Sequence, residues 1–192
     1  MSSFGGAIRI GELLPTSPPI THALKLEFYA HEYYYFNYSS NDYTSCYTWP
    51  AVGCDSYWNQ PAAGYNGTTN SYIKPGALLA VPPNEAGAVN DSLLTIPGKK
   101  ILDALTNYGG YIVDDTACPS AAICMEHAVN GELIETYGYS VAIENPLTST
   151  QGADFFADLV TIFRALAVVT NNAVDNVGGG GNPRAPAPPP FC

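Results

Sequence analysis

Short apolar stretches with the period of a strand recur through the first two thirds of the chain. Residues 22–30 alternate apolar and polar side chains, which predicts a strand with one buried face. Residues 76–81 form a continuous apolar run closed by two prolines, the pattern of a buried strand. Three further stretches predict an edge strand and two more strands, namely 7–14, 111–113 and 121–127.

Two segments carry the helical period instead. The first opens at Pro97 and ends at Gly109, and its apolar side chains form one stripe of Ile101, Leu102, Leu105 and Tyr108. The second opens at Ser149 or Thr150 and ends at the Asn pair 171–172. Its apolar face consists of Phe155, Phe156, Leu159, Ile162, Phe163, Leu166 and Val169.

Together these elements predict an α+β fold, built as a single β-rich domain with sandwich-like antiparallel sheets and two helices. A chain of 192 residues fits one domain, which we expect to span 1–177. Residues 178–192 begin with four glycines and continue with closely spaced prolines. This composition is typical of a flexible hinge joined to an extended polyproline II spacer, so it predicts a Gly/Pro-rich tail.

The densest aromatic segment lies between residues 28 and 58, which hold twelve Phe, Tyr and Trp side chains in thirty-one positions. Such side chains fill protein cores, form protein interfaces and stack on sugar rings. Neighbouring strand residues point to opposite faces, so part of the run should be exposed. The candidates for a self-interface or a polysaccharide platform are Tyr33, Tyr34, Tyr35, Trp49 and Trp58, and plain core packing is the third alternative.

Charge is scarce and negative, with 12% charged residues and a formal net charge of −10. The seven basic residues are scattered apart from Lys99-Lys100, which argues against nucleic acid and anionic membranes as partners. No stretch approaches the roughly 18 apolar residues of a membrane-spanning helix. The acidity serves solubility, or else a calcium site or a cationic partner; no other cofactor is expected.

Five cysteines predict a disulfide framework. Cys46 and Cys54 flank a short aromatic segment, and Cys118 and Cys124 flank a short apolar one, so two local disulfides are the simplest pairing. Each would stabilise the fold by roughly 2–3 kcal/mol. The spacings differ from the closely spaced cysteine pairs of zinc sites. Cys192 is left over as a free thiol or an intermolecular link.

Three sequons for N-glycosylation begin at Asn37, Asn66 and Asn90, each in polar, loop-like surroundings. With the cysteines and the low charge they indicate an extracellular or cell-surface glycoprotein. Residues 1–20 lack the basic and apolar regions of a secretory signal, so we expect a mature or excerpted form.

Catalytic candidates are few. The best set is His22, Asp114, Glu126 and His127, which would serve a secreted polysaccharide-active hydrolase or lyase. Glycosidases need two carboxyl groups about 5–10 Å apart, and adjacent strand carboxylates point to opposite faces. Capping, turn formation or calcium ligation is therefore the alternative role of Asp114. No nucleophile elbow, P-loop or dinucleotide fingerprint is present.

Several segments resemble, in order, a family of uncharacterised extracellular bacterial domains that often occur beside carbohydrate-binding modules. The shared pieces are Gly5-Gly6-Ala-Ile-Arg9-Ile-Gly11-Glu12-Leu-Leu-Pro15, His22-Ala23-Leu24-Lys25, Tyr47-Thr-Trp49-Pro50-Ala51-Val52, Asn107-Tyr108-Gly109, Tyr111-Ile-Val113-Asp114-Asp115-Thr116-Ala117 and the late Asn171-Asn172 with its Gly-rich run. The paired cysteines and the Pro-rich end depart from the family pattern. The resemblance implies an extracellular, polysaccharide-associated setting and carries no catalytic residues.

The leading hypothesis is a non-catalytic extracellular glycoprotein module that acts as a structural or self-assembling surface or filament component. Its partner would be a further copy of itself, through the Tyr-rich face and the tail. The alternatives are a carbohydrate-binding module and a secreted polysaccharide-active enzyme.

Overall fold

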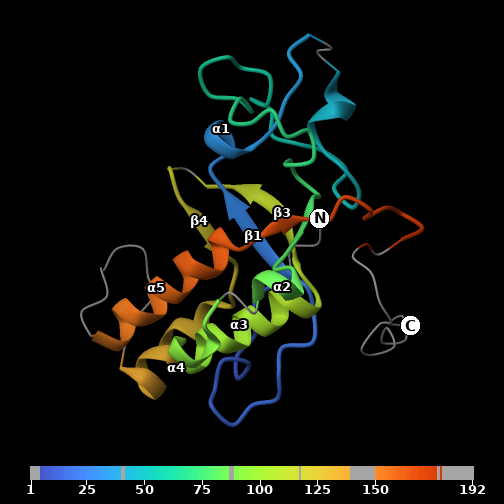
Figure 1. Ribbon diagram of the computed structural model, residues 1–192. Helices are drawn as coiled ribbons and strands as arrows, with labels where there is room; N and C mark the ends of the chain where they lie inside the picture. The colour runs from blue at the N-terminus through green and yellow to red at the C-terminus, as the bar shows by residue number, and fades with distance from the viewer. Residues whose placement is uncertain are drawn as a thin grey trace, which may run out of the picture.

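The computed structural model describes residues 5–39, 42–86, 89–116, 118–138, 150–176 and 178. These residues form an α+β fold around one mixed sheet of five strands in the order β4-β1-β3-β2-β5 (Figure 1). The strands are β1 Leu24–Phe28, β2 Leu78–Ala80, β3 Gly110–Asp115, β4 Ala121–Ile123 and β5 Ala167–Val168.

The central pair, β1 and β3, is parallel, and the other strand pairs are antiparallel. The parallel register runs from Leu24 opposite Gly110 and shifts between Leu26 and Glu27. Because both strands run the same way, their carboxyl ends meet at one edge of the sheet. The parallel pair therefore places the end of β1 beside the Asp114-Asp115 pair that ends β3.

Three longer helices gather on one side of the sheet: α3 Ile96–Asn107, α4 His127–Tyr137 and α5 Thr150–Arg164 (Figure 1). Four shorter helical turns lie in the connections: α1 Ala30–Tyr33, η1 Tyr43–Cys46, α2 Pro83–Ala86 and η2 Asp91–Leu93. Residues 29–77 connect β1 to β2 and form a long excursion. It lies beyond the carboxyl end of β1, away from the three longer helices (Figure 1). We call residues 29–77 the aromatic excursion.

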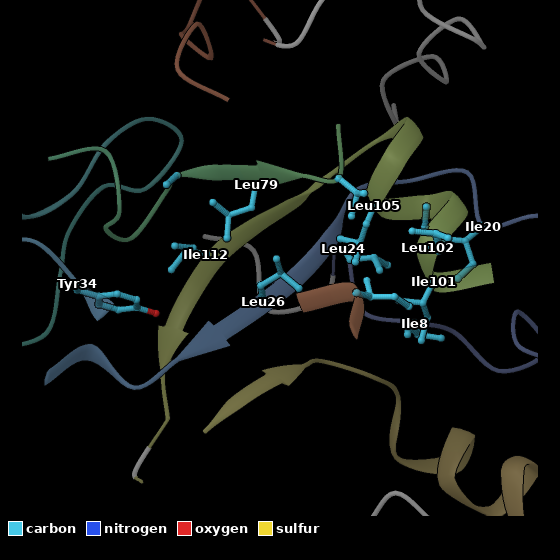
Figure 2. Close-up of a cluster of buried hydrophobic side chains, with 14 of the residues drawn as sticks. Ile8, Ile20, Leu24, Leu26, Tyr34, Leu79, Ile101, Leu102, Leu105 and Ile112 are labelled. Atoms are coloured by element: carbon cyan, nitrogen blue, oxygen red, sulfur yellow. The ribbon is translucent and has the colours of Figure 1, made fainter. Parts of the chain in front are cut away.

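The core lies between the sheet and α3. Leu24 and Leu26 of β1 and Ile112 of β3 are at most 1% exposed; Leu24 lies beside Leu105 of the helix, and Ile112 lies toward Leu79 of β2 (Figure 2). The alternation along each strand puts the next residues, such as Lys25 and Tyr111, on the opposite face of the sheet.

Helix α3 begins where its sequence indicates, because Thr95 accepts a hydrogen bond from the amide of Gly98. A tertiary contact reinforces this cap. The carboxylate of Asp158, on α5 and 5% exposed, accepts from both the amide and the hydroxyl of Thr95 at 2.8 and 2.6 Å. The contact joins α5 to the start of α3.

The α+β class is confirmed, but the arrangement differs from the prediction. The structure has one mixed sheet in place of the predicted antiparallel sandwich. More residues lie in helices than in strands, so the domain is not β-rich. The predicted helix ends at Arg164 rather than near residue 171, because the chain then pairs with β2 as β5. The predicted tail 178–192 lies outside the described residues apart from Gly178.

Two predicted strands are also corrected. Residues 7–14 are mostly turns, and only Ile8 pairs, in a single bridge with Met125. The strand expected over 121–127 ends at Ile123, and helix α4 begins at His127. Short segments satisfy their backbone groups with whatever neighbour the fold supplies, which their own sequence does not specify.

Gly131→Ala is expected to stabilise the fold by about 0.5–1 kcal/mol, because alanine has the higher helix propensity. Gly131 lies inside α4, and an added Cβ would meet no heavy atom within 4 Å. Chemical denaturation measures the change. The control is Gly138→Ala, which also meets open space but has φ +76°. It is expected to destabilise, and a loss of stability in Gly131→Ala would contradict the assignment of α4.

Candidate functional site

A disulfide closes part of the aromatic excursion. Cys46 and Cys54 are bonded, as the sequence predicted, and Cys46 is fully buried. The preceding turn η1 is capped by Asp42, whose carboxylate accepts from the amide and hydroxyl of Thr44 at 2.9 Å. The bond and the cap fix the segment that leads into Trp49.

Tyrosine hydroxyls and carboxylates tie the excursion to the sheet. Asp115, at the end of β3, accepts from the amide of Ala30 at 2.7 Å and from the hydroxyl of Tyr57 at 2.5 Å. The hydroxyl of Tyr65 donates to Asp55 at 2.5 Å within the excursion. Both oxygens of Asp115 therefore serve the chain's own donors, which indicates a structural role for this carboxylate.

Ring contacts complete the packing. Tyr34 and Tyr65 meet edge to face with centroids 5.1 Å apart, and Phe36 meets Trp58 at 4.2 Å. Figure 2 shows Tyr34 at the end of the sheet remote from Leu102. Its hydroxyl donates to the backbone oxygen of Asp114.

Two of the predicted binding residues are consequently wrong. Tyr34 is fully buried and Trp58 is 8% exposed, so neither has a face available to a ligand. Both side chains pack inside the excursion, where Tyr34 contacts Tyr65 and Trp58 contacts Phe36. Tyr35 is half-buried, with the ammonium of Lys74 at 5.9 Å from its ring centroid. Tyr33 and Trp49 remain exposed.

Burial raises the pKa of Tyr34, Tyr57 and Tyr65 above the ordinary tyrosine value. The carboxylates of Asp115 and Asp55 add to the rise for Tyr57 and Tyr65, since a phenolate beside a carboxylate is repelled. These hydroxyls stay protonated and act as donors across the neutral range.

Stability is expected to fall as the pH rises above about 10, the pKa of tyrosine in the unfolded chain. The unfolded state then loses protons that the folded Tyr34, Tyr57 and Tyr65 retain, so alkali favours unfolding. Absorbance of phenolate followed alongside circular dichroism tests this. We expect a group of tyrosines to titrate only together with the loss of structure. Complete titration of all tyrosines in the folded chain would contradict the buried network.

The candidate catalytic residues are not gathered into one site. His22 hydrogen-bonds Glu12 at 3.1 Å, Glu126 accepts from the amide of Ile10 at 2.9 Å, and the side chains of Asp114 and His127 are exposed. Among the described residues, no hydrogen bond or ion pair joins any two of His22, Asp114, Glu126 and His127.

Glu126, one of these candidates, belongs to a group of three carboxylates that bind residues 9–11, which we call the carboxylate clamp. Three consecutive backbone amides donate to three different carboxylates at 2.7–2.9 Å. The donors are Arg9, Ile10 and Gly11, and the acceptors are Glu12, Glu126 and Glu132 in the same order. The sequence gives no local sign of this clamp, because two of the acceptors lie more than a hundred residues away.

The second predicted disulfide is wrong, since Cys118 and Cys124 are both free thiols. The thiol of Cys124 donates to the carboxylate of Glu27 at 3.0 Å, while Cys118 is exposed in the turn after β3. Burial, and then the neighbouring Glu27, raise the pKa of Cys124 to about 12, so the thiol is protonated at neutral pH. Such a thiol is a poor nucleophile.

The predicted glycosylation sites are sterically open. The side chains of Asn37, Asn66 and Asn90 are exposed. Asn90 accepts a hydrogen bond from the hydroxyl of Ser92, the third residue of its sequon, at 2.6 Å. Within the described ranges, no cluster of three His, Cys, Asp or Glu side chains is arranged to hold a metal ion.

Neither a family model nor a curated protein nor a solved structure matches this chain. The described part of the chain contains no helix long and apolar enough to cross a membrane. The disulfide fits an oxidising compartment.

Proposed function

We propose that the chain is a non-catalytic extracellular module that serves as a structural, self-assembling component through the exposed side of its aromatic excursion. The observation that carries the proposal is the distribution of exposed apolar side chains. Half of the large hydrophobic side chains that stand exposed among the described residues lie on the excursion: Tyr33, Tyr38, Tyr43, Trp49, Val52 and Tyr72. Aromatic side chains that reach solvent in one region are typical of protein interfaces.

The low charge of the excursion supports contacts between identical copies. Its four charged side chains, in forty-nine residues, are Glu32, Asp42, Asp55 and Lys74. Two copies of a chain with a net charge of −10 repel each other. The repulsion is weakest when the copies meet through their excursions, which carry few charges.

The excursion is also ordered before any partner arrives. The Cys46–Cys54 bond and the hydrogen bonds to Asp115 and Asp55 hold it in place. Association therefore loses less conformational entropy, because this surface is already ordered in the free chain. The exposed sequons and the disulfide support an extracellular, glycosylated setting.

The test is the size of the purified chain by multi-angle light scattering and electron microscopy. We expect particles larger than a monomer, and we expect Val52→Asp to shift them toward the monomer. Val52 is 83% exposed on the excursion, so the change does not disturb the core. The matched control is Val174→Asp, at a residue 78% exposed outside the excursion, which should leave the particles unchanged. A monomer at every concentration would refute self-assembly.

The tail is the second contact that the sequence offers. Removing residues 178–192 is expected to weaken the particles, because the Pro-rich spacer and Cys192 would no longer reach a neighbour. The single change Cys192→Ser separates a covalent link from a contact of the spacer. Unchanged assembly without the tail would remove its proposed role while leaving that of the excursion in place.

A further inference from the structure

Two hollows adjoin residues 48–50: Thr48 lines the first and Pro50 lines the second. The first has a volume of about 290 Å³, and its polar lining comes from three segments of the chain: Thr48; Ser71, Tyr72 and Lys74; and Thr170 with Asn172. The second has a volume of about 300 Å³ and is lined by Gly6, Lys25, Pro50, Tyr111 and Val113, among others. These volumes are at the lower end of the roughly 300–1,000 Å³ of small-ligand sites, which suits single sugar residues of a longer chain.

Hydrogen bonds show that the two hollows are neighbours. Tyr111, which lines the second hollow, donates its hydroxyl to Asn172, which lines the first, at 3.2 Å. The amide group of Asn172 in turn donates to the backbone oxygen of Trp49 at 3.4 Å. Thr48 lines the first hollow and Pro50 the second, so the chain passes from one hollow to the other through Trp49, which itself lines neither.

The lining suits a saccharide. Hydroxyl and amide groups, such as those of Ser71 and Thr170, can exchange hydrogen bonds with sugar hydroxyls. Tyr72 and Trp49 are 51% and 39% exposed, so both aromatic residues reach solvent, where the apolar side of a sugar ring can stack on them. Aromatic platforms combined with convergent polar groups distinguish this surface from the purely aromatic exposed positions, such as Tyr38.

The charge of the hollows is opposite to that of the chain. The charged side chain in the first hollow is Lys74, and that in the second is Lys25, while neither Asp nor Glu lines either one. This is unexpected in a chain with seven basic and seventeen acidic residues. Lys74 lines the first hollow, and its ammonium donates to the backbone oxygen of Ser45 at 2.9 Å, which leaves two of its N–H donors for a ligand.

We propose that an acidic polysaccharide, a glycan strand that carries carboxylate groups, binds across Trp49 with its sugar residues in the two hollows. Lys74 would face the carboxylates, and Trp49 and Tyr72 would stack on the rings, while Lys25 is buried at 9% exposure and adds only positive potential at the second hollow. This site goes beyond the proposed assembly, and because it shares Trp49 and Tyr72 with the assembly surface, the glycan and a second copy of the chain would compete for them. It also differs from the platform that the sequence suggested, because Tyr34 and Trp58 are buried and Tyr72, Lys74 and Asn172 were not among the candidates.

The experiment measures the binding of oligogalacturonate, with neutral cello-oligosaccharides of equal length as the comparison, by isothermal titration calorimetry at two salt concentrations. We expect oligogalacturonate to bind more tightly and to weaken with salt. Trp49→Ala and Tyr72→Ala should each weaken binding by about tenfold, a loss typical of a stacking contact at the centre of an interface. Lys74→Gln should remove the preference for the acidic glycan.

The matched control is Tyr38→Ala, since Tyr38 and Trp49 have the same exposed fraction of 39%. It should bind as the unaltered chain does, and circular dichroism should show every variant folded. Absence of oligogalacturonate binding would overturn the proposal, as would equal, salt-independent binding of the neutral glycan. Light scattering of the same samples reports assembly separately, so a failure of one proposal is visible apart from the other.

Discussion

Gly76→Ala is expected to destabilise the chain by about 2–5 kcal/mol, the combined cost of a left-handed backbone and an overpacked contact. Gly76 has φ +92°, and an added Cβ would lie 1.8 Å from the backbone oxygen of Thr48. A backbone atom cannot rotate away as a side chain does. The amide of Gly76 also donates to the oxygen of Ile112 at 2.9 Å, so the residue is held from both sides. Urea denaturation followed by tryptophan fluorescence measures the loss.

The control for this prediction is Gly11→Ala. Gly11 has φ +89°, but an added Cβ there would meet nothing within 4 Å. It therefore carries the cost of the left-handed backbone alone, about 1–2 kcal/mol. Equal losses in the two variants would show that the excursion yields at Thr48 and is less rigid than its contacts indicate.

Asp115→Ala is expected to cost about 2–4 kcal/mol, because two donors would lose their acceptor in a largely buried setting. The amide of Ala30, a fully buried residue, and the hydroxyl of Tyr57 both depend on this carboxylate. The excursion should also become accessible to protease before the rest of the chain unfolds. Thermal denaturation and limited proteolysis measure the two effects.

The adjacent residue provides the comparison. The side chain of Asp114 is exposed and accepts a bond from the amide of Asp115 at 2.9 Å. Asp114→Ala should therefore cost no more than about 0.5–1 kcal/mol. A large loss at Asp114 with none at Asp115 would contradict the assignment, because it would place the structural role on Asp114 instead.

The sequence by itself determined the elements whose signals are local. The alternation around Leu24 and Leu26 placed β1, the run at Leu78 placed β2, and the Pro97 stripe placed α3. These predictions succeed because hydrophobic period and end signals depend on neighbouring residues alone. The Cys46–Cys54 bond was also expected from its short spacing, but the same spacing argument failed for Cys118 and Cys124, so loop length alone does not decide which cysteines pair.

Helix α4 had a local signal that was missed. Val129 and Leu133 are spaced by four residues and are fully buried, which is the helical period. The apolar run at 121–127 nevertheless predicts a single strand up to His127. Short apolar stretches fit both periods, so the residues after the run decide which element forms. Here the helix begins at His127, the last residue of the predicted strand.

Tertiary structure alone decided which polar and aromatic side chains meet. Asp115 reaches Tyr57 across fifty-eight positions of the chain, and Glu126 and Glu132 reach the turn at residues 9–11 across more than a hundred. The parallel pairing of β1 and β3 brings their ends together, and no local pattern encodes that choice. The same long-range packing buried Tyr34 and Trp58 while leaving Trp49 exposed, and Tyr72 exposed in the hollow that Lys74 also lines. The hydrophobic period and the composition of a segment determine which of its side chains can be buried. Which distant segment covers them depends on the apolar and hydrogen-bonding surfaces that the whole fold brings together.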